Sequence, residues 1–104
     1  DMVISGGFNI YPSDLEAELC KEPGVVEAAV VGVPSRAWGE TPVGFVVLKG
    51  EADTAAILAS VNARLGKTQR LAALHAIAEM PRSHIGKLLK TDLREEAARR
   101  GGTD

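Results

Sequence analysis

The sequence contains little of what several classes of functional site require. Aromatic residues make up 4% of its 104 residues, which argues against a surface on which nucleic-acid bases stack. There are 12 Lys and Arg against 14 Asp and Glu, so no basic excess is present to attract a phosphate backbone. The apolar runs are far too short to cross a bilayer. We therefore expect neither nucleic acid nor a membrane as a partner.

Cysteine and histidine are scarce as well. Cys20 is the only cysteine, so no intramolecular disulfide can form, and a reducing, cytoplasmic setting is expected. His75 and His84 are isolated in the sequence, whereas a metal centre needs three or four ligands that converge. We expect no metal site in this chain, and we expect Cys20 to be a packed thiol on a helix.

The sequence lacks a methionine at position 1: it begins at Asp1, and Met2 is second. A native translation start would place Met first, so we expect a piece cut from a longer protein. Within this piece, 45% hydrophobic and 25% charged residues match ordinary globular composition. The length fits one domain, and no repeat or linker divides it.

Apolar, β-branched runs predict the strands of a small sheet. Val25–Val33 is interrupted only by Glu27, which is typical of a strand buried on both faces. Val43–Leu48 predicts a second central strand and Leu71–Ala78 a third. Before them, residues 1–12 predict a strand–turn–strand hairpin, because its paired glycines tolerate positive φ.

Capping residues predict where helices begin. Ser13 and Glu16 have the spacing of a capping box, which would start a helix that ends before Pro23. Asp53 is placed to cap a second helix, which runs to Leu65.

A third helix is expected over Asp92–Arg100, with Thr91 as its cap and Gly101-Gly102 after its end. Together these elements indicate an α+β domain. We expect a small central sheet of about three strands, covered by three helices, with an N-terminal β-hairpin beside it.

Three segments have patterns that packing alone does not require. The hairpin turn Ser5-Gly6-Gly7-Phe8 carries glycines that let its backbone approach another strand or a ligand. Trp38 lies in a predicted polar loop, Pro34–Pro42, where it either stacks on a purine or a partner or folds back over the core. The loop Pro81–Lys87 ends in a cation that suits phosphate or carboxylate oxygens, and a solvated surface lysine is the ordinary alternative.

Together these segments resemble the C-terminal domain of the adenylate-forming enzymes, which include acyl- and aryl-CoA synthetases, luciferases and nonribosomal-peptide adenylation domains. The run from Asp1 to Pro12, followed by Asp14-Leu15-Glu16, is similar to the segment that opens this domain. Pro81-Arg82, followed by Gly86-Lys87-Leu88, is similar to the segment that carries the family's catalytic lysine. The resemblance covers almost the whole chain.

The resemblance implies a ligase that works in two half-reactions. A carboxylic acid attacks the α-phosphate of ATP to give an acyl-adenylate and pyrophosphate, and a thiol, usually that of CoA, then displaces AMP. Lys87 is implied as the catalytic residue of the first half-reaction. Ser5, Gly6, Gly7 and Phe8 are implied to line the pantetheine tunnel of the second, where a β-carbon would narrow the passage.

Three further residues are implied in binding the nucleotide part of CoA. Trp38 matches an aromatic that packs on the CoA adenine in some aryl-CoA ligases. Arg36 and Arg70 are expected to meet CoA phosphates. Thr68 departs from the pattern, because some CoA ligases carry an aromatic in this basic loop.

The resemblance also implies what lies outside the chain. We expect residues 1–104 to form the mobile C-terminal lid domain, which begins just after the hinge before Asp1 and partners its own N-terminal large domain. That absent domain would hold the ATP and acyl pockets and the expected Mg²⁺, so the isolated chain is expected to be inactive. Two alternatives stay open: the C-terminal part of an adenylation domain that loads a carrier protein, and a non-catalytic interaction module of similar fold.

Overall fold

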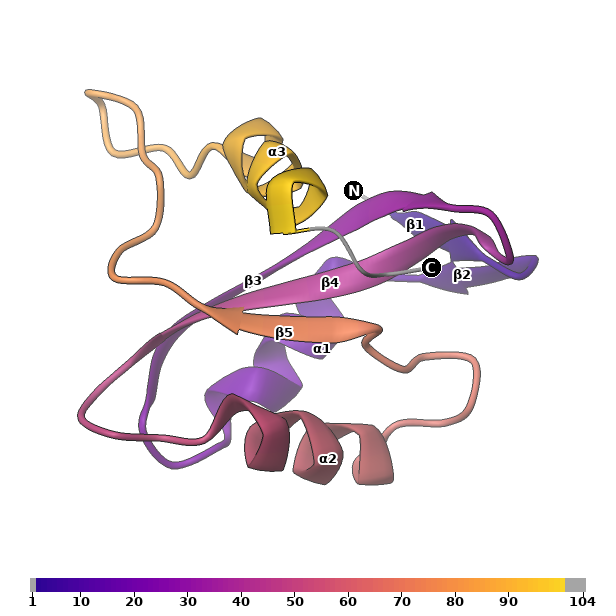
Figure 1. The fold of residues 1–104 in the computed structure, drawn as a ribbon, viewed down its shortest axis with the longest axis horizontal. Coiled ribbons are helices and arrows are strands. Elements are labelled where there is room, and N and C mark those ends of the chain that lie inside the picture. Colours follow the sequence, from indigo (N-terminus) through magenta and orange to yellow (C-terminus); the bar gives the residue numbers. More distant parts are fainter. Residues whose placement is uncertain (1, 101–104) are drawn as a thin grey trace.

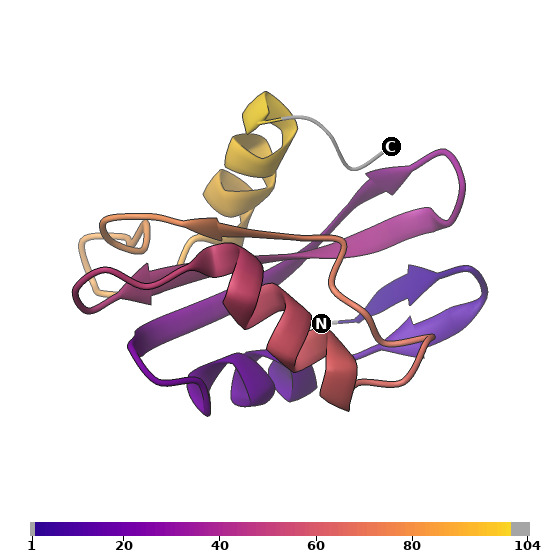
Figure 2. The ribbon, with the colours of Figure 1, turned by 60° about the horizontal axis from the view of Figure 1, so that its bottom comes forward.

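Three layers make up the fold in the computed structural model, which describes residues 2–100. A β-sheet lies between α3 on one face and α1 with α2 on the other (Figure 1; Figure 2). In chain order the elements are β1 (Val3–Ser5), β2 (Phe8–Ile10), α1 (Pro12–Cys20), β3 (Val25–Ser35), β4 (Gly39–Leu48), α2 (Thr54–Arg64), β5 (Ala73–Ala76) and α3 (Lys90–Arg100). The α+β class and the three helices are confirmed.

The sheet has five strands in the order β2-β1-β4-β3, and β5 pairs in parallel with β4. The three expected central strands are β3, β4 and β5, and β5 is shorter than its predicted run. The helix α2 joins the parallel strands β4 and β5, as such a connection requires. The expected hairpin forms as β1 and β2, and it belongs to the same sheet through the pairing of Ser5 with Gly39.

The predicted polar loop Pro34–Pro42 is wrong. β3 continues to Ser35 and β4 begins at Gly39, so only residues 36–38 form the turn. Two features make this possible. The exposed Pro34 lies on an edge strand, where a missing N–H removes no bond between strands. Gly39, the first residue of β4, has φ of 83°, which glycine adopts without strain as the chain leaves the turn.

Two apolar clusters, one on each face of the sheet, form the core. On the face covered by α1 and α2, Val30 and Val46 of the sheet pack in one cluster with Leu15 and Leu19 of α1. The alternate strand residues, among them Phe45, face α3 and pack with its Leu93 and Ala97. The middle of β3 is therefore buried on both sides, as its unbroken apolar run predicts.

The helix starts differ in part from the sequence expectation. α1 begins at Pro12, which needs no hydrogen-bond partner for its nitrogen, and Ser13 makes no cap. The Asp53 carboxylate does cap α2 by accepting the N–H of Ala55 at 2.9 Å. α3 begins at Lys90, so Thr91 lies inside the helix.

The expected end of α3 at Gly101-Gly102 lies outside the described residues. None of the helices within residues 2–100 is long and apolar enough to cross a membrane.

Candidate functional site

Lys87 stands near the tip of a narrow loop that links β5 to α3. We call residues 81–89 the Lys87 loop. Its two sides are joined by backbone hydrogen bonds: the N–H of Leu89 donates to the carbonyl of Pro81, and the N–H of Ser83 donates to that of Lys87, both at 2.9 Å. The turn passes through Gly86, whose φ of 87° favours glycine. The backbone that carries the Lys87 side chain is therefore held in place by hydrogen bonds across the loop.

The Lys87 side chain is exposed. Within residues 2–100 its ammonium makes no ion pair with another residue. The neighbouring cation Arg82 differs, because it pairs with Glu27 of β3 at 2.6 Å and donates to the carbonyl of Gly86 at 3.3 Å. Lys87 is thus held out toward whatever approaches the loop, while Arg82 is held back against the sheet.

The glycine hairpin and Trp38 are in direct contact. The N–H of Gly6 donates to the Trp38 carbonyl at 2.8 Å, and a β-carbon built on Gly6 would lie 2.8 Å from the ring atom Cε3. Only glycine allows the indole to lie so close to this backbone, which also has a positive φ of 58°. The Trp38 side chain is nevertheless 59% exposed, so it does not fold back as a lid over the core.

A cavity of about 260 Å³ opens beside Trp38. We call it the Trp38 cleft. Its lining comes from β1, β2, the β3–β4 hairpin and the loop before β5, and consists of Ser5, Phe8, Ile10, Trp38, Thr41, Lys67, Thr68, Arg70, Leu71 and Ala72. The structure therefore brings together four of the predicted site residues: Ser5, Phe8, Trp38 and Arg70.

The other three residues that are predicted to contact CoA do not line this cleft. Gly6 lies under the indole, Gly7 faces open space, and the exposed Arg36 is in the turn before Trp38. Conversely, Lys67 lines the cleft, although only Arg70 of this loop was assigned to the site. The sequence feature that indicates Lys67 is its position in the short loop Lys67-Thr68-Gln69-Arg70, which has a cation at each end.

The Lys87 loop and the glycine hairpin lie at opposite ends of the sheet. In Figure 1 the orange loop projects beyond one end of the strands, and β1 and β2 lie at the other end. Figure 2 shows the same separation from a second direction. The two segments therefore face different ends of the domain.

The cysteine and the two histidines are also candidates for site residues. Among residues 2–100, no three or more His, Cys, Asp or Glu side chains are grouped to hold a metal ion. Cys20 is exposed, so its prediction as a packed thiol is wrong. His75 is partly buried beside Phe45, and this burial lowers its pKa, as does the charge of Arg100.

Comparison with known proteins decides the family. The model described as the AMP-binding enzyme C-terminal domain matches residues 14–87. This chain belongs to that family. The matched stretch of the AMP-binding enzyme C-terminal domain runs from α1 to Lys87, so it includes the Trp38 turn, the basic loop and most of the Lys87 loop.

Similar AMP-binding enzyme C-terminal domains occur in much longer proteins. The 2-succinylbenzoate–CoA ligase of Geobacillus kaustophilus is 43% identical over 96 residues, which cover 90% of this chain and 20% of that protein. The solved structure of ATP-bound MatB from Rhodopseudomonas palustris matches with a TM-score of 0.86 at 39% identity, over 92% of this chain and 20% of that one. A Mycobacterium tuberculosis fatty acyl CoA synthetase matches with a TM-score of 0.86 at 37% identity, over 96% and 20%. The chain thus spans about a fifth of the length of these proteins.

Proposed function

We propose that this chain is the mobile C-terminal domain of an ATP-dependent carboxylic acid–CoA ligase. In this proposal Lys87 serves adenylate formation, and the end of the sheet that carries the glycine hairpin serves thioester formation. The observation that carries the proposal is the position of Lys87, an exposed ammonium with no ion-pair partner in residues 2–100, held at the tip of a hydrogen-bonded loop. Names of relatives as CoA ligases support the same reaction class.

The chemistry of adenylation needs such a cation. Negative charge spreads over the α-phosphate oxygens as the carboxylate attacks, and an ammonium placed there stabilises the transition state in a site shielded from water. The same ammonium can contact both the carboxylate and the phosphate, which helps to keep them in line. We assign the ATP and acyl pockets, and the accompanying Mg²⁺, to the rest of the protein.

The other end of the sheet suits the thiol substrate. Gly6 and Gly7 offer bare backbone beside which a thin pantetheine chain can pass, and the Trp38 cleft adds an aromatic face with two cations, Lys67 and Arg70. An aromatic face can stack on an adenine, and the cations can meet phosphates. Because the two ends lie apart, the domain would turn between the half-reactions and present one end at a time.

The exposed Trp38 also favours free CoA over a carrier protein as the acceptor, because a carrier protein offers no adenine. The alternative of a non-catalytic interaction module requires that neither end of the sheet matters for a reaction. Assays of the two half-reactions distinguish a CoA ligase, an adenylation domain that loads a carrier protein, and a non-catalytic module.

The test is Lys87→Ala in the full-length ligase that contains this chain. Pyrophosphate release from acid and ATP should fall by about 100-fold or more, which is the size of effect seen when one charge-stabilising donor is removed. Thioester formation from a supplied acyl-adenylate and CoA should be nearly unchanged. Lys49→Ala is the matched control, since Lys49 is an exposed lysine at the end of β4. Normal pyrophosphate release in Lys87→Ala would overturn the assignment.

A further inference from the structure

At Val30, the outer edge of β3 is covered by two side chains of opposite charge. β3 lies at one edge of the sheet, where backbone groups that point outward need other partners. The N–H of Val30 donates to Glu16 Oε2 at 2.9 Å, and the Val30 carbonyl accepts from Lys90 Nζ at 3.1 Å. Glu16 and Lys90 are themselves paired at 3.1 Å. Together they occupy the hydrogen-bonding positions that a neighbouring strand would fill.

This arrangement joins elements from both faces of the sheet. Glu16 belongs to α1, below the sheet in Figure 1, and Lys90 is the first residue of α3, above it. The Glu16 and Lys90 side chains are each 24% exposed, against 44% for Arg82 and 41% for Glu27. The Glu16–Lys90 pair is therefore the better shielded of these two, and solvent and salt weaken it less.

Lys90 follows Lys87 by three residues, so it fixes the point at which the Lys87 loop returns to the fold. Arg82 fixes the other side, through Glu27 of the same strand. Both sides of the loop are thus fastened to β3 by a cation. Of the two, only Lys90 also binds the strand backbone, according to the contacts within residues 2–100.

We propose that Lys90 is a positioning residue for the adenylation step. Its ammonium pairs with the Glu16 carboxylate and donates to the Val30 carbonyl, and these contacts hold the Lys87 loop in a fixed position relative to β3. This inference rests on the proposed function of Lys87. Displacing a reacting group by about 1 Å can cost about 100-fold in rate, so a loosened support should be visible in the rate of adenylation.

A purely structural role of Lys90 would have a different signature. Loss of fold stability lowers both half-reactions together, because both need the folded domain. Loss of loop position lowers adenylation alone, because β1 and β2, which carry the glycine hairpin and line the Trp38 cleft, lie at the other end of the sheet (Figure 1). The ratio of the two rates therefore separates the two roles.

The experiment compares Lys90→Met and Glu16→Gln in the full-length ligase with the unchanged protein. Methionine keeps much of the aliphatic stem but removes the ammonium, and glutamine keeps an acceptor for the Val30 N–H but removes the charge. We expect pyrophosphate release to fall about 10- to 100-fold in Lys90→Met and less in Glu16→Gln. Thioester formation from supplied acyl-adenylate should stay nearly unchanged in both. Lys90→Arg should recover most of the rate, because arginine can reach both partners.

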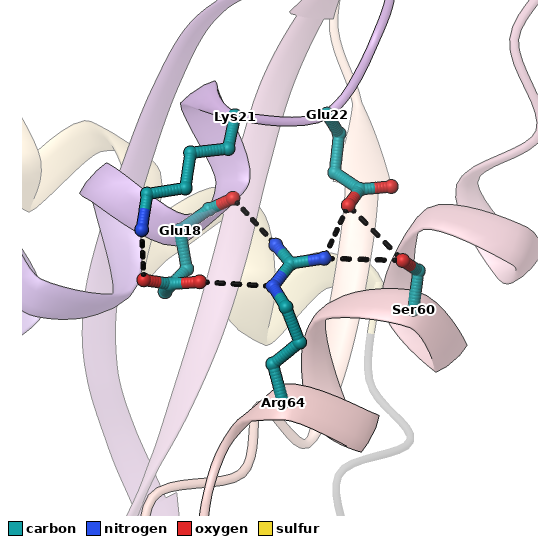
Figure 3. A network of polar contacts seen from close by, with 5 residues as sticks. All are labelled: Glu18, Lys21, Glu22, Ser60 and Arg64. Carbon is teal, nitrogen blue, oxygen red and sulfur yellow. Dashed lines mark hydrogen bonds and ion pairs between the residues drawn. The ribbon is translucent and has the colours of Figure 1, made fainter.

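Arg64→Met provides the matched control. Arg64 joins α2 to α1 through Glu18 at 3.0 Å and Glu22 at 2.7 Å, with Lys21 and Ser60 in the same network (Figure 3). This network joins residues of α1, α2 and the turn after α1, and the residues that it joins are not part of the Lys87 loop. Its loss should leave the ratio of the two half-reaction rates as it is in the unchanged protein.

Lys87→Ala, measured in parallel, keeps the two proposals distinct. If Lys87→Ala releases pyrophosphate normally, the proposed function fails, and the positioning role fails with it. If Lys87→Ala loses pyrophosphate release but Lys90→Met does not, only the positioning role fails. An equal fall of both half-reactions in Lys90→Met, or a change of ratio in Arg64→Met, would likewise overturn it.

Discussion

The Lys87 loop and the Trp38 cleft place their functional residues by different physical means. The loop extends one cation from a pair of backbone hydrogen bonds, and it is fastened to β3 by the Arg82–Glu27 ion pair and by the hydrogen bond from Lys90 to the Val30 carbonyl. The cleft is built by packing: hairpins meet where Gly6 lets the Trp38 ring lie on its backbone. In the proposed function the domain serves two half-reactions in turn, and this separation lets each end of the sheet serve one of them.

The largest effect is expected from a bulky side chain in the glycine hairpin, which tests whether the two ends of the sheet serve different half-reactions. In the full-length ligase, Gly7→Leu should lower thioester formation from supplied acyl-adenylate by about 100-fold, because the side chain obstructs the approach of the thiol. Pyrophosphate release should be much less affected. Within the domain a β-carbon on Gly7 meets nothing within 4 Å, so the expected obstruction concerns the ligand and not the fold.

Gly50→Leu is the control for backbone strain. Gly50 has a positive φ of 74° and open space around it, as Gly7 has, but it lies between β4 and α2. Strain of about 1–2 kcal/mol from a side chain in this conformation should appear in both variants. If Gly50→Leu lowers thioester formation as much as Gly7→Leu does, the tunnel interpretation is wrong.

A smaller effect is expected at Trp38, and it sharpens the choice of acceptor. Trp38→Ala should raise the KM for CoA about tenfold, as expected when one stacked base loses its aromatic partner. The KM for ATP should hardly change, because Lys87, which is proposed to contact the phosphate, lies at the other end of the sheet. Steady-state kinetics with each substrate varied in turn provides the measurement. An unchanged KM for CoA would return Trp38 to a packing role and favour the carrier-protein alternative.

The sequence predicts the central strands well, because Val25–Val33 and Val43–Leu48 are apolar runs whose burial needs no knowledge of their neighbours. It fails at Pro34–Pro42, where two prolines and polar residues conceal a strand pairing, and Pro34 fits into that pairing because β3 is an edge strand. It fails again at Ser13, which is predicted to cap the first helix. The helix instead begins one residue earlier, at Pro12, because proline is favoured at the first helical position.

The candidate site could be predicted only residue by residue. The local motif predicts Lys87 as a site residue, and the Lys87 loop keeps that motif together. The convergence of Phe8, Trp38, Lys67 and Arg70 depends on how distant hairpins pack, which no local pattern encodes. The contact of Lys90 with Val30 spans 60 residues, and Glu16 has the spacing of a cap yet binds β3 instead.

The smallest effect concerns a residue outside both regions. Burial, and then the charge of Arg100, lower the pKa of His75, so the unfolded chain binds a proton more readily than the folded one. Its contribution to stability is therefore complete above the unfolded pKa of about 6.5 and is lost as the pH falls toward the lower folded value. Urea denaturation of the chain between about pH 7.5 and 5.5 should show this loss, and His75→Gln should remove it.

This acid effect should lower both half-reactions together, in contrast to changes at either end of the sheet. The carboxylates of Glu18 and Glu96 do not interfere in this range. Their arginine and lysine partners hold their pKa values below the ordinary 4.5, so they titrate at lower pH. A stability profile that is flat across the range, or unchanged by His75→Gln, would contradict the assignment to His75.

The division of labour between the two ends is tested most directly by measuring both half-reactions in Lys87→Ala and Gly7→Leu, side by side in the full-length ligase. We predict opposite losses: Lys87→Ala loses pyrophosphate release and keeps thioester formation from supplied acyl-adenylate, and Gly7→Leu does the reverse. Equal loss of both half-reactions in both variants would contradict the account.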